Sequence, residues 1–200
     1  MTENIHQQAY SISNEGRAQQ KRQKPIMIWL TGLSGSGKST IANQLDVSLN
    51  ALGHHTFCLD GDNIRMGINN NLGFSEDDRN ENLRRVAEIG KLMINAGLIC
   101  IGAFISPLKK DRELVKHIIG EENYFEIFVD ATLSVCEARD VKGLYAKARK
   151  GEIKNFTGIN APFEKPRESD LVIQTGEITV NEAVLKIMDK IKNRININNG

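Results

Sequence analysis

The most informative stretch of this 200-residue chain is Gly32-Leu33-Ser34-Gly35-Ser36-Gly37-Lys38-Ser39-Thr40. It matches in full the pattern G-x-x-x-x-G-K-[ST], the P-loop, in which glycines let backbone N–H groups turn inward around phosphate. The apolar run 26–30 before it favours a β-strand, and the residues after it favour a helix as far as about residue 52. This context predicts a nucleoside triphosphate site, where Lys38 reaches the β- and γ-phosphates and the Ser39 hydroxyl binds Mg²⁺.

The same alternation of strands and helices continues along the chain. Strands are predicted at 56–59, 98–104, 124–129 and 171–174. Helices are predicted at 77–96, after a cap at Ser75, at 109–119 and 132–139, and after a capping box of Thr179 and Glu182. This alternation predicts an α/β fold, a parallel sheet with helices on both faces, which binds ligands at the carboxyl ends of its strands.

Two stretches differ from this pattern. Residues 1–24 are polar with little apolar periodicity, and we expect an N-terminal arm that is either mobile or ordered on a partner subunit. Residues 25–200 then form one domain, which is the size expected for a single core. Within it, residues 140–168 are basic, interrupted by glycines and poor in apolar anchors, which indicates a loop-like lid that closes over bound ligands.

The composition is that of an ordinary globular protein, with 40% hydrophobic and 26% charged residues. The formal net charge of +1 creates no global field for nucleic acid or for a membrane surface, so neither is an expected partner. No stretch reaches the ~18 apolar residues that a membrane span needs. Cys58, Cys100 and Cys136 show no CxxC spacing, and we expect reduced thiols in a cytoplasmic protein.

An acidic segment, Leu59-Asp60-Gly61-Asp62, follows the second predicted strand. Two carboxylates at i and i+2 beside a triphosphate site favour binding of Mg²⁺ or orientation of an acceptor hydroxyl. The same segment is also a good turn and helix cap. Beside an intact P-loop, the functional interpretation is the stronger one.

Side chains suited to an anionic, aromatic ligand come next. Arginine grips phosphate or sulfate with paired hydrogen bonds, and a phenyl ring stacks on a purine. The residues concerned are Arg65, Phe74, Arg79 and Asn82. Spacing alone leaves open a solvated helix face for the arginines and a core position for the phenylalanine.

Two classes of P-loop protein lack support. A guanine-specific switch protein usually carries an N-K-x-D segment late in the chain, and this sequence has none. Motors and large ATPases usually carry a strand that ends in an acid. Here the third predicted strand ends without one, although the fourth ends at Asp130. These observations favour a small-molecule kinase.

In the order and spacing of its motifs, the chain resembles the adenylylsulfate kinase family over about residues 5–195. The segments that carry the resemblance are 32–40, 59–65, 74–82, 104–107 with Asp111-Arg112, 136–145 and 156–159 followed by Ala161-Pro162. The resemblance implies a P-loop NTPase three-layer sandwich, a P-loop kinase domain with a five-stranded parallel sheet, as a homodimer. It implies that ATP with Mg²⁺ phosphorylates the 3′-hydroxyl of adenosine 5′-phosphosulfate (APS), in sulfate activation.

The resemblance also implies roles for individual residues. Contacts to APS would come from Asp62, Arg65, Phe74, Arg79, Asn82, Ile105, Ser106, Lys142, Leu144 and Phe156. Phe74 and Phe156 would form the two faces of a clamp on the adenine of APS. Residues 32–40 would hold the phosphates of ATP, and Arg139 would contact its adenine.

The catalytic residues implied in the same way are Lys38, Asp60, Asp62, Ser106 and Lys142. Ser39 and Asp60 would hold the metal, and the two aspartates would position the 3′-hydroxyl and metal-bound water; which carboxylate accepts the proton, if either does, stays open. Ser106 matches a serine linked to a phosphoenzyme in the family, and a helix cap also explains a hydroxyl there. The chain departs from the family pattern at Lys109, Asn160 and Phe163, where arginine, aspartate and tyrosine are common.

Two alternatives remain at the level of sequence. One is another small-molecule P-loop kinase, for gluconate or a nucleoside; the pair Phe74 and Phe156 favours a planar nucleotide over a sugar acid. The other is a non-catalytic nucleotide-binding module that regulates a partner. Such modules usually lose P-loop residues, whereas Lys38, Ser39 and Asp60 are all present here.

Overall fold

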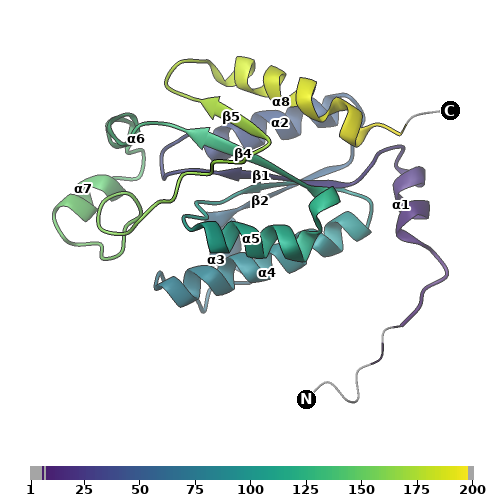
Figure 1. Cartoon of the computed structure of the whole chain (residues 1–200), viewed down its shortest axis with the longest axis horizontal. Coiled ribbons are helices and arrows are strands. Elements are labelled where there is room, and N and C mark those ends of the chain that lie inside the picture. The colour runs from purple at the N-terminus through teal and green to yellow at the C-terminus, as the bar shows by residue number, and fades with distance from the viewer. Residues whose placement is uncertain (1–5, 7, 198–200) are drawn as a thin grey trace.

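The computed structural model describes residue 6 and residues 8–197; the other residues of the expected arm, 1–5 and 7, and residues 198–200 lie outside the described residues. At its centre is an all-parallel sheet of five strands in the order β2-β3-β1-β4-β5 (Figure 1). The strands are β1 (Ile26–Thr31), β2 (Thr56–Asp60), β3 (Ile99–Ala103), β4 (Tyr124–Asp130) and β5 (Leu171–Gln174). The predicted α/β fold with a five-stranded parallel sheet is confirmed.

Helices cover both faces of the sheet (Figure 1). On one face lie α2 (Lys38–Ala51) and α8 (Val180–Ile195), and on the other lie α4 (Glu76–Asn95) and α5 (Lys109–Ile119). The result is the expected three-layer sandwich. Within the described part of the chain, no helix combines the length and apolar character needed to cross a bilayer.

The central strand β1 shows why this sheet forms. Its residues alternate between the two cores, with Ile26, Ile28 and Leu30 packing under α2 and α8. Met27 and Trp29 point to the opposite core, under α4 and α5. A parallel strand covered on both faces is therefore apolar along its whole length, as the sequence pattern indicated.

The predicted caps of the long helices are confirmed. The Ser75 side chain accepts a hydrogen bond from the backbone N–H of Asp78 at the start of α4. At the start of α8, Thr179 and Glu182 form the complete capping box. These caps satisfy N–H groups that have no partner inside the helix.

Four short elements were not predicted. They are α1 (Asn14–Gln20), α3 (Gly61–Met66), α7 (Leu144–Arg149) and a 3₁₀ turn at Glu121–Asn123, whereas the predicted α6 is confirmed as Leu133–Arg139. Helices of one or two turns are too short to show a 3.6-residue period of apolar residues. These four elements are therefore seen in the structure but could not be predicted from the sequence pattern.

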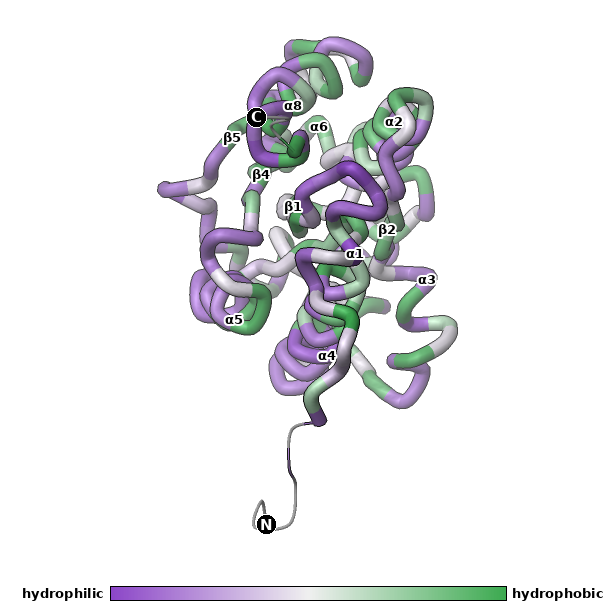
Figure 2. The backbone as a smooth tube through the Cα atoms, turned by 90° about the vertical axis from the view of Figure 1, so that its right-hand side faces the viewer, coloured by the Kyte–Doolittle hydropathy of each residue, from purple (hydrophilic) through white to green (hydrophobic). Residues whose placement is uncertain are grey.

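The second half of the expected arm orders on its own chain. Gln23 is 0% exposed, and its side chain accepts from the His55 N–H at 2.8 Å and donates to the carbonyls of His55 and Gly97 at 2.8 and 2.9 Å. Helix α1 lies so close that a Cβ on Gly97 would meet the Arg17 carbonyl oxygen at 2.9 Å. The segment is mostly hydrophilic (Figure 2), so the hydrogen bonds of Gln23 and the close approach of α1 to Gly97, rather than an apolar face, attach it to the body.

The stretch 140–168 is more structured than its composition suggested. It contains α7, and Tyr145, Ala148 and Phe156 are buried in a small apolar cluster with Cys136 of α6. The expectation of a loop with few apolar anchors is therefore wrong. The segment has a small core of its own, which the sequence did not reveal because its buried residues are spaced irregularly along the chain.

A substitution at Gly102, in the middle of β3, tests how tightly the core is packed. A Cβ there would lie 2.8 Å from Met27 Cε and 2.8 Å from Trp29 Cε3. We expect Gly102→Ala to lower the free energy of unfolding by about 1–3 kcal/mol, because the added methyl must displace a packed side chain. Urea unfolding of both proteins measures the difference.

The matched control is Gly16→Ala in α1, where the nearest atom to an added Cβ lies at an ordinary 3.6 Å. Since alanine favours a helix more than glycine does, this variant should lose no stability. An unchanged unfolding free energy for Gly102→Ala, or an equal loss in both variants, would contradict the packing argument.

Candidate active site

The P-loop follows β1 and turns sharply into α2. Gly32, Gly35 and Gly37 have φ angles of 153°, 72° and 102°, which L-residues with side chains rarely adopt. At Gly32 a Cβ would lie 2.5 Å from the Val129 carbonyl oxygen of β4. The loop can therefore lie against the sheet only with glycine at this position.

Lys38 is buried in the loop that precedes it. Its Nζ donates to the carbonyl oxygens of Gly32 at 2.9 Å and Leu33 at 2.7 Å. Burial lowers the pKa of its ammonium group to about 8. The side chain thus holds a positive charge at the centre of the loop, where phosphate would add compensating negative charge.

The Ser36 hydroxyl is a second polar group facing this region. It is buried and has no hydrogen-bond partner among the described residues. Buried polar groups normally have partners, so an unsatisfied hydroxyl in a P-loop fits a site that is completed by a ligand.

Ser39 and Asp60 are brought together, as predicted for a metal site. The Ser39 Oγ donates to Asp60 Oδ2 at 2.6 Å, across the ends of β1 and β2. The other carboxylate oxygen, Asp60 Oδ1, accepts from the Asp62 N–H at 3.0 Å and caps α3. The helix-cap interpretation is thus confirmed, and the functional interpretation is compatible with it because the two functions would use different carboxylate oxygens.

This donor set fits Mg²⁺. A hydroxyl and a carboxylate are oxygen ligands, and Mg²⁺ in phosphate-binding sites is held by one or two side chains together with phosphate and water. In the described residues there is no cluster of three or more His, Cys, Asp or Glu that could enclose a metal by itself. The residues present suit a metal that arrives with a nucleotide.

Asp62 links the acidic segment to the lid. Its carboxylate forms an ion pair with the Lys142 ammonium, which comes from the turn after α6. Both side chains are more than half exposed, so the pair contributes little to stability. Its significance is positional, since it places a lid cation beside the two aspartates.

Arg65, Phe74 and Arg79 form the predicted cationic and aromatic group. The Arg65 guanidinium lies 4.5 Å from the Phe74 ring centroid, and that of Arg79 lies 5.7 Å from it. Phe74 is 60% exposed, which excludes the core position considered for it. Desolvation lowers the pKa of both guanidinium groups, so neither arginine lies on a fully solvated face.

Phe156 lies apart from solvent, unlike Phe74. It is 8% exposed and packs edge-on against the Tyr145 ring, with ring centroids 4.9 Å apart. Arg79 joins the two phenylalanines, because it donates to the Asn155 carbonyl at 2.7 Å and to Thr157 Oγ1 at 3.3 Å. One face of the expected clamp is open and the other is packed inside the lid.

Asn82, on α4, and Ile105, two residues after β3, are each held by a hydrogen bond. Asn82 is buried, and its Oδ1 accepts from Asn69 Nδ2 at 3.0 Å. The Ile105 carbonyl accepts from Thr31 Oγ1 at 2.9 Å. Leu144, at the start of α7, packs against the apolar cluster of the lid.

Ser106 is enclosed rather than open to a ligand. It is 1% exposed, and its Oγ accepts from Trp29 Nε1 at 3.0 Å and donates to Thr31 Oγ1 at 2.8 Å. The expected helix cap is wrong, since Leu108 is the N-cap of α5 and the Ser106 hydroxyl bonds to Trp29 and Thr31 rather than to an N–H of that helix. Instead, the hydroxyl ties the turn after β3, where Ser106 has a φ of 35°, to β1.

Arg139, the last residue of α6, lies against the P-loop. Its guanidinium donates to the carbonyl oxygens of Gly35 at 3.2 Å and Ser36 at 3.3 Å, and to the Thr175 carbonyl at 2.8 Å. Arg139 thus joins the P-loop to the segment between β5 and α8, and its exposed side chain remains accessible.

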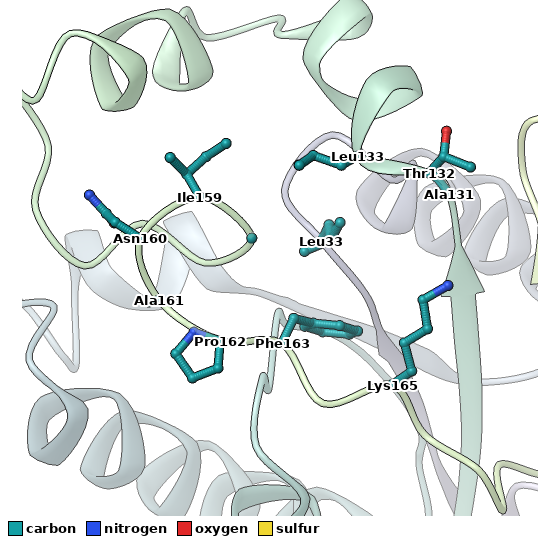
Figure 3. A pocket seen from close by; sticks show the side chains of 11 residues that line it. Leu33, Ala131, Thr132, Leu133, Ile159, Asn160, Ala161, Pro162, Phe163 and Lys165 are labelled. Carbon is teal, nitrogen blue, oxygen red and sulfur yellow. The ribbon is translucent and has the colours of Figure 1, made fainter.

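A cavity of about 600 Å³ lies between the P-loop, the end of β4 and the returning lid (Figure 3). Two of the residues that depart from the family pattern, Asn160 and Phe163, line it. Asn160 Oδ1 accepts from the Phe156 N–H at 2.5 Å, a bond that an aspartate would also form. Phe163 stacks on Phe128 with centroids 6.0 Å apart. The third, Lys109, has an exposed side chain, and its N–H donates to Glu164 Oε2 at 2.5 Å.

Several contributors to the site were not predicted as site residues. Asn69 holds Asn82, Thr31 holds Ser106, and Thr175 holds Arg139. Tyr145 and Thr157 connect the lid to the rest of the site. Most of these contacts join residues more than 70 positions apart, so no local pattern reveals them.

The comparisons with known proteins agree with this geometry. A family model described as adenylylsulphate kinase matches residues 24–174. The adenylyl-sulfate kinase of Marinobacter nauticus is 50% identical over 191 residues, which cover 96% of each chain. That of Shewanella pealeana is 52% identical over 180 residues, 90% of this chain and 88% of the relative.

A comparison with a solved structure indicates the same family. The APS kinase of Mycobacterium tuberculosis, in complex with AMPPNP and APS, superposes with a TM-score of 0.82 at 41% identity, covering 84% of this chain and 98% of that one. The sequence matches span almost the whole chain and include the P-loop, the acidic segment and the lid. This chain therefore belongs to the adenylylsulfate kinase family.

Proposed function

We propose that this chain transfers the γ-phosphoryl group of MgATP to the 3′-hydroxyl of APS, forming 3′-phosphoadenosine 5′-phosphosulfate and ADP. The observation that carries the proposal is the meeting of two kinds of site at the carboxyl ends of β1 and β2. Ser39 of the P-loop contacts Asp60, and Asp62 two residues later contacts Lys142 of the lid. A phosphate site and an acceptor site thus share one acidic segment.

On the nucleotide side, residues 32–40 bind the phosphates through backbone N–H groups and the Lys38 ammonium. Arg139, which already joins the P-loop to Thr175, contacts the adenine. Ser39 and Asp60 would hold Mg²⁺, which when bound would offset the negative charge of the triphosphate. Lys38 can serve this site only by leaving the carbonyls of Gly32 and Leu33.

On the acceptor side, the group around Phe74 favours a ligand that is both anionic and aromatic. Arg65 and Arg79 supply the positive charge that a phosphosulfate needs, and the exposed ring supplies a stacking surface. Phe156, Asn82, Ile105 and Leu144 complete the contacts to APS. A sugar acid such as gluconate would use the arginines but not the ring.

The chemistry requires alignment more than a strong base. Phosphoryl transfer through a loose transition state depends on positioning and on neutralising charge. Asp60 and Asp62 together would position the 3′-hydroxyl and metal-bound water. Lys142 brings positive charge beside the oxygens that gain negative charge. The lid excludes water and thereby limits hydrolysis of ATP.

Ser106 acts in this proposal as a positioning residue. Its hydroxyl is already occupied by Trp29 and Thr31, and its carbonyl accepts from the buried Arg112 at 3.0 Å. These bonds fix the turn that presents Ile105 to the acceptor. A phosphoenzyme at Ser106 would have to break two buried hydrogen bonds in every cycle.

The proposal predicts ADP release that requires both APS and Lys38. In a coupled assay with MgATP, the wild type should release ADP only when APS is added, and Lys38→Ala should reduce the rate roughly 100-fold or more. Lys91→Ala, an exposed lysine on α4, is the control and should match the wild type. Release with gluconate but not with APS would overturn the proposed acceptor.

Ser106→Ala separates positioning from covalent catalysis. We expect the variant to retain turnover within about tenfold of the wild type, while its free energy of unfolding falls by about 1–3 kcal/mol because the Trp29 N–H loses its buried acceptor. Ser48→Ala on α2 provides the control for loss of a helix-surface hydroxyl. Complete loss of turnover in a folded Ser106→Ala protein would instead support a phosphoenzyme.

We also propose a homodimer and a cytoplasmic location. Tyr10 and Ile12 of the arm are 79% and 63% exposed, which suits packing on a second subunit. Three free cysteines support a reducing compartment. Light scattering should give a mass about twice that of the 22.3 kDa chain, and a monomer at micromolar concentration would refute the dimer.

A further inference from the structure

Tyr145 connects the lid to the P-loop. Its hydroxyl donates to the Ser34 carbonyl at 2.8 Å, across 111 positions of sequence. The side chain is 3% exposed, so water does not compete freely for this bond. Burial also raises the pKa of Tyr145, which keeps the hydroxyl a neutral donor.

The Tyr145 ring also connects the lid to the residues proposed to bind APS. Phe156 meets it edge-on at 4.9 Å, with an angle of 79° between the ring planes. The two neighbours of Phe156, Asn155 and Thr157, both accept hydrogen bonds from Arg79. A continuous series of contacts therefore runs from the P-loop through Tyr145 to the residues proposed to bind APS.

The hydroxyl is not needed to build α7. Asp140 accepts from the N–H groups of Tyr145 and Ala146, each at 3.0 Å, and so stabilises the first turn of the helix. The ring itself is held by the apolar cluster with Cys136 and Ala148. What the hydroxyl adds is a hydrogen bond from the lid to the loop that binds the nucleotide, beside the apolar contact that Leu33 of that loop makes with the same cluster.

We propose that Tyr145 is a positioning residue whose hydroxyl couples occupancy of the P-loop to the placement of Phe156. The inference rests on the proposed function only in taking APS as the ligand next to Phe156. The contacts from Ser34 through Tyr145 to Phe156 do not depend on it. A triphosphate fixes the backbone of residues 32–40, including the Ser34 carbonyl. Because the Tyr145 hydroxyl is bonded to that carbonyl, the nucleotide also fixes the ring on which Phe156 packs.

The coupling should act in both directions. A free energy that links two sites changes the affinity of each by the same factor. Binding of the nucleotide therefore strengthens binding of APS, and APS strengthens binding of the nucleotide. Loss of one hydrogen bond between partners that remain in place changes such an equilibrium roughly three- to tenfold.

The test compares wild type with Tyr145→Phe, which removes only the hydroxyl. Tyr124→Phe is the matched control, because Tyr124 is also buried and its hydroxyl has no partner among the described residues. Hydrogen exchange of the amides in 153–159 is measured with and without Mg²⁺ and the non-hydrolysable analogue AMPPNP. This readout needs the nucleotide alone and is independent of the acceptor.

We expect AMPPNP to slow exchange in this segment in the wild type and in Tyr124→Phe, and to do so roughly three- to tenfold less in Tyr145→Phe. Calorimetry then gives the affinity for APS with and without AMPPNP. In Tyr145→Phe the affinity for APS alone should stay close to that of the wild type, and the gain caused by AMPPNP should shrink by the same factor.

Three results would overturn the inference. They are an absence of protection by AMPPNP in the wild type, equal protection in the wild type and Tyr145→Phe, and an equal loss of APS affinity with and without AMPPNP. The last would mean that the hydroxyl merely supports the lid. Failure of the wild type to bind APS, with the exchange result as expected, would refute the proposed acceptor and leave the link from the P-loop to Phe156 intact.

Discussion

The absence of a side chain at residue 32 is the constraint on which the rest of the structure depends. Only a glycine lets the P-loop lie against the Val129 carbonyl of β4, where a Cβ would come within 2.5 Å. The position of the loop determines where α2 begins, where Lys38 is buried and where Ser39 meets Asp60. The loop also positions the carbonyl oxygens of Gly35 and Ser34, which accept hydrogen bonds from Arg139 and Tyr145. The placement of both side chains therefore depends on the loop.

A parallel sheet assembles the site from distant segments. The P-loop, the acidic segment and the turn at Ser106 all follow the carboxyl ends of adjacent strands, β1, β2 and β3. Side chains 75 and 77 positions apart thereby become neighbours, as Ser106 does with Thr31 and Trp29. The lid then supplies the groups that no strand end provides, Lys142 and Phe156.

The sequence was sufficient to predict the features that arise from residues close together in the chain. The P-loop, the strands and the helix caps at Ser75 and Thr179 each depend on a few consecutive residues, and all were predicted. The core of the lid was missed because Tyr145 and Phe156 are 11 positions apart with no periodic pattern between them. The bonds of Ser106 to Trp29 and Thr31 were missed because a hydroxyl after a strand fits a cap equally well, and only the fold reveals its partners.

The resting position of Lys38 has a consequence for selectivity. While its ammonium is satisfied by two carbonyl oxygens, a ligand must offer stronger acceptors to draw it away. The oxygens of a triphosphate carry enough charge to do so, whereas those of a nucleoside do not. Under the proposed function, the resting position of Lys38 therefore favours charged ligands over neutral molecules of the same outline.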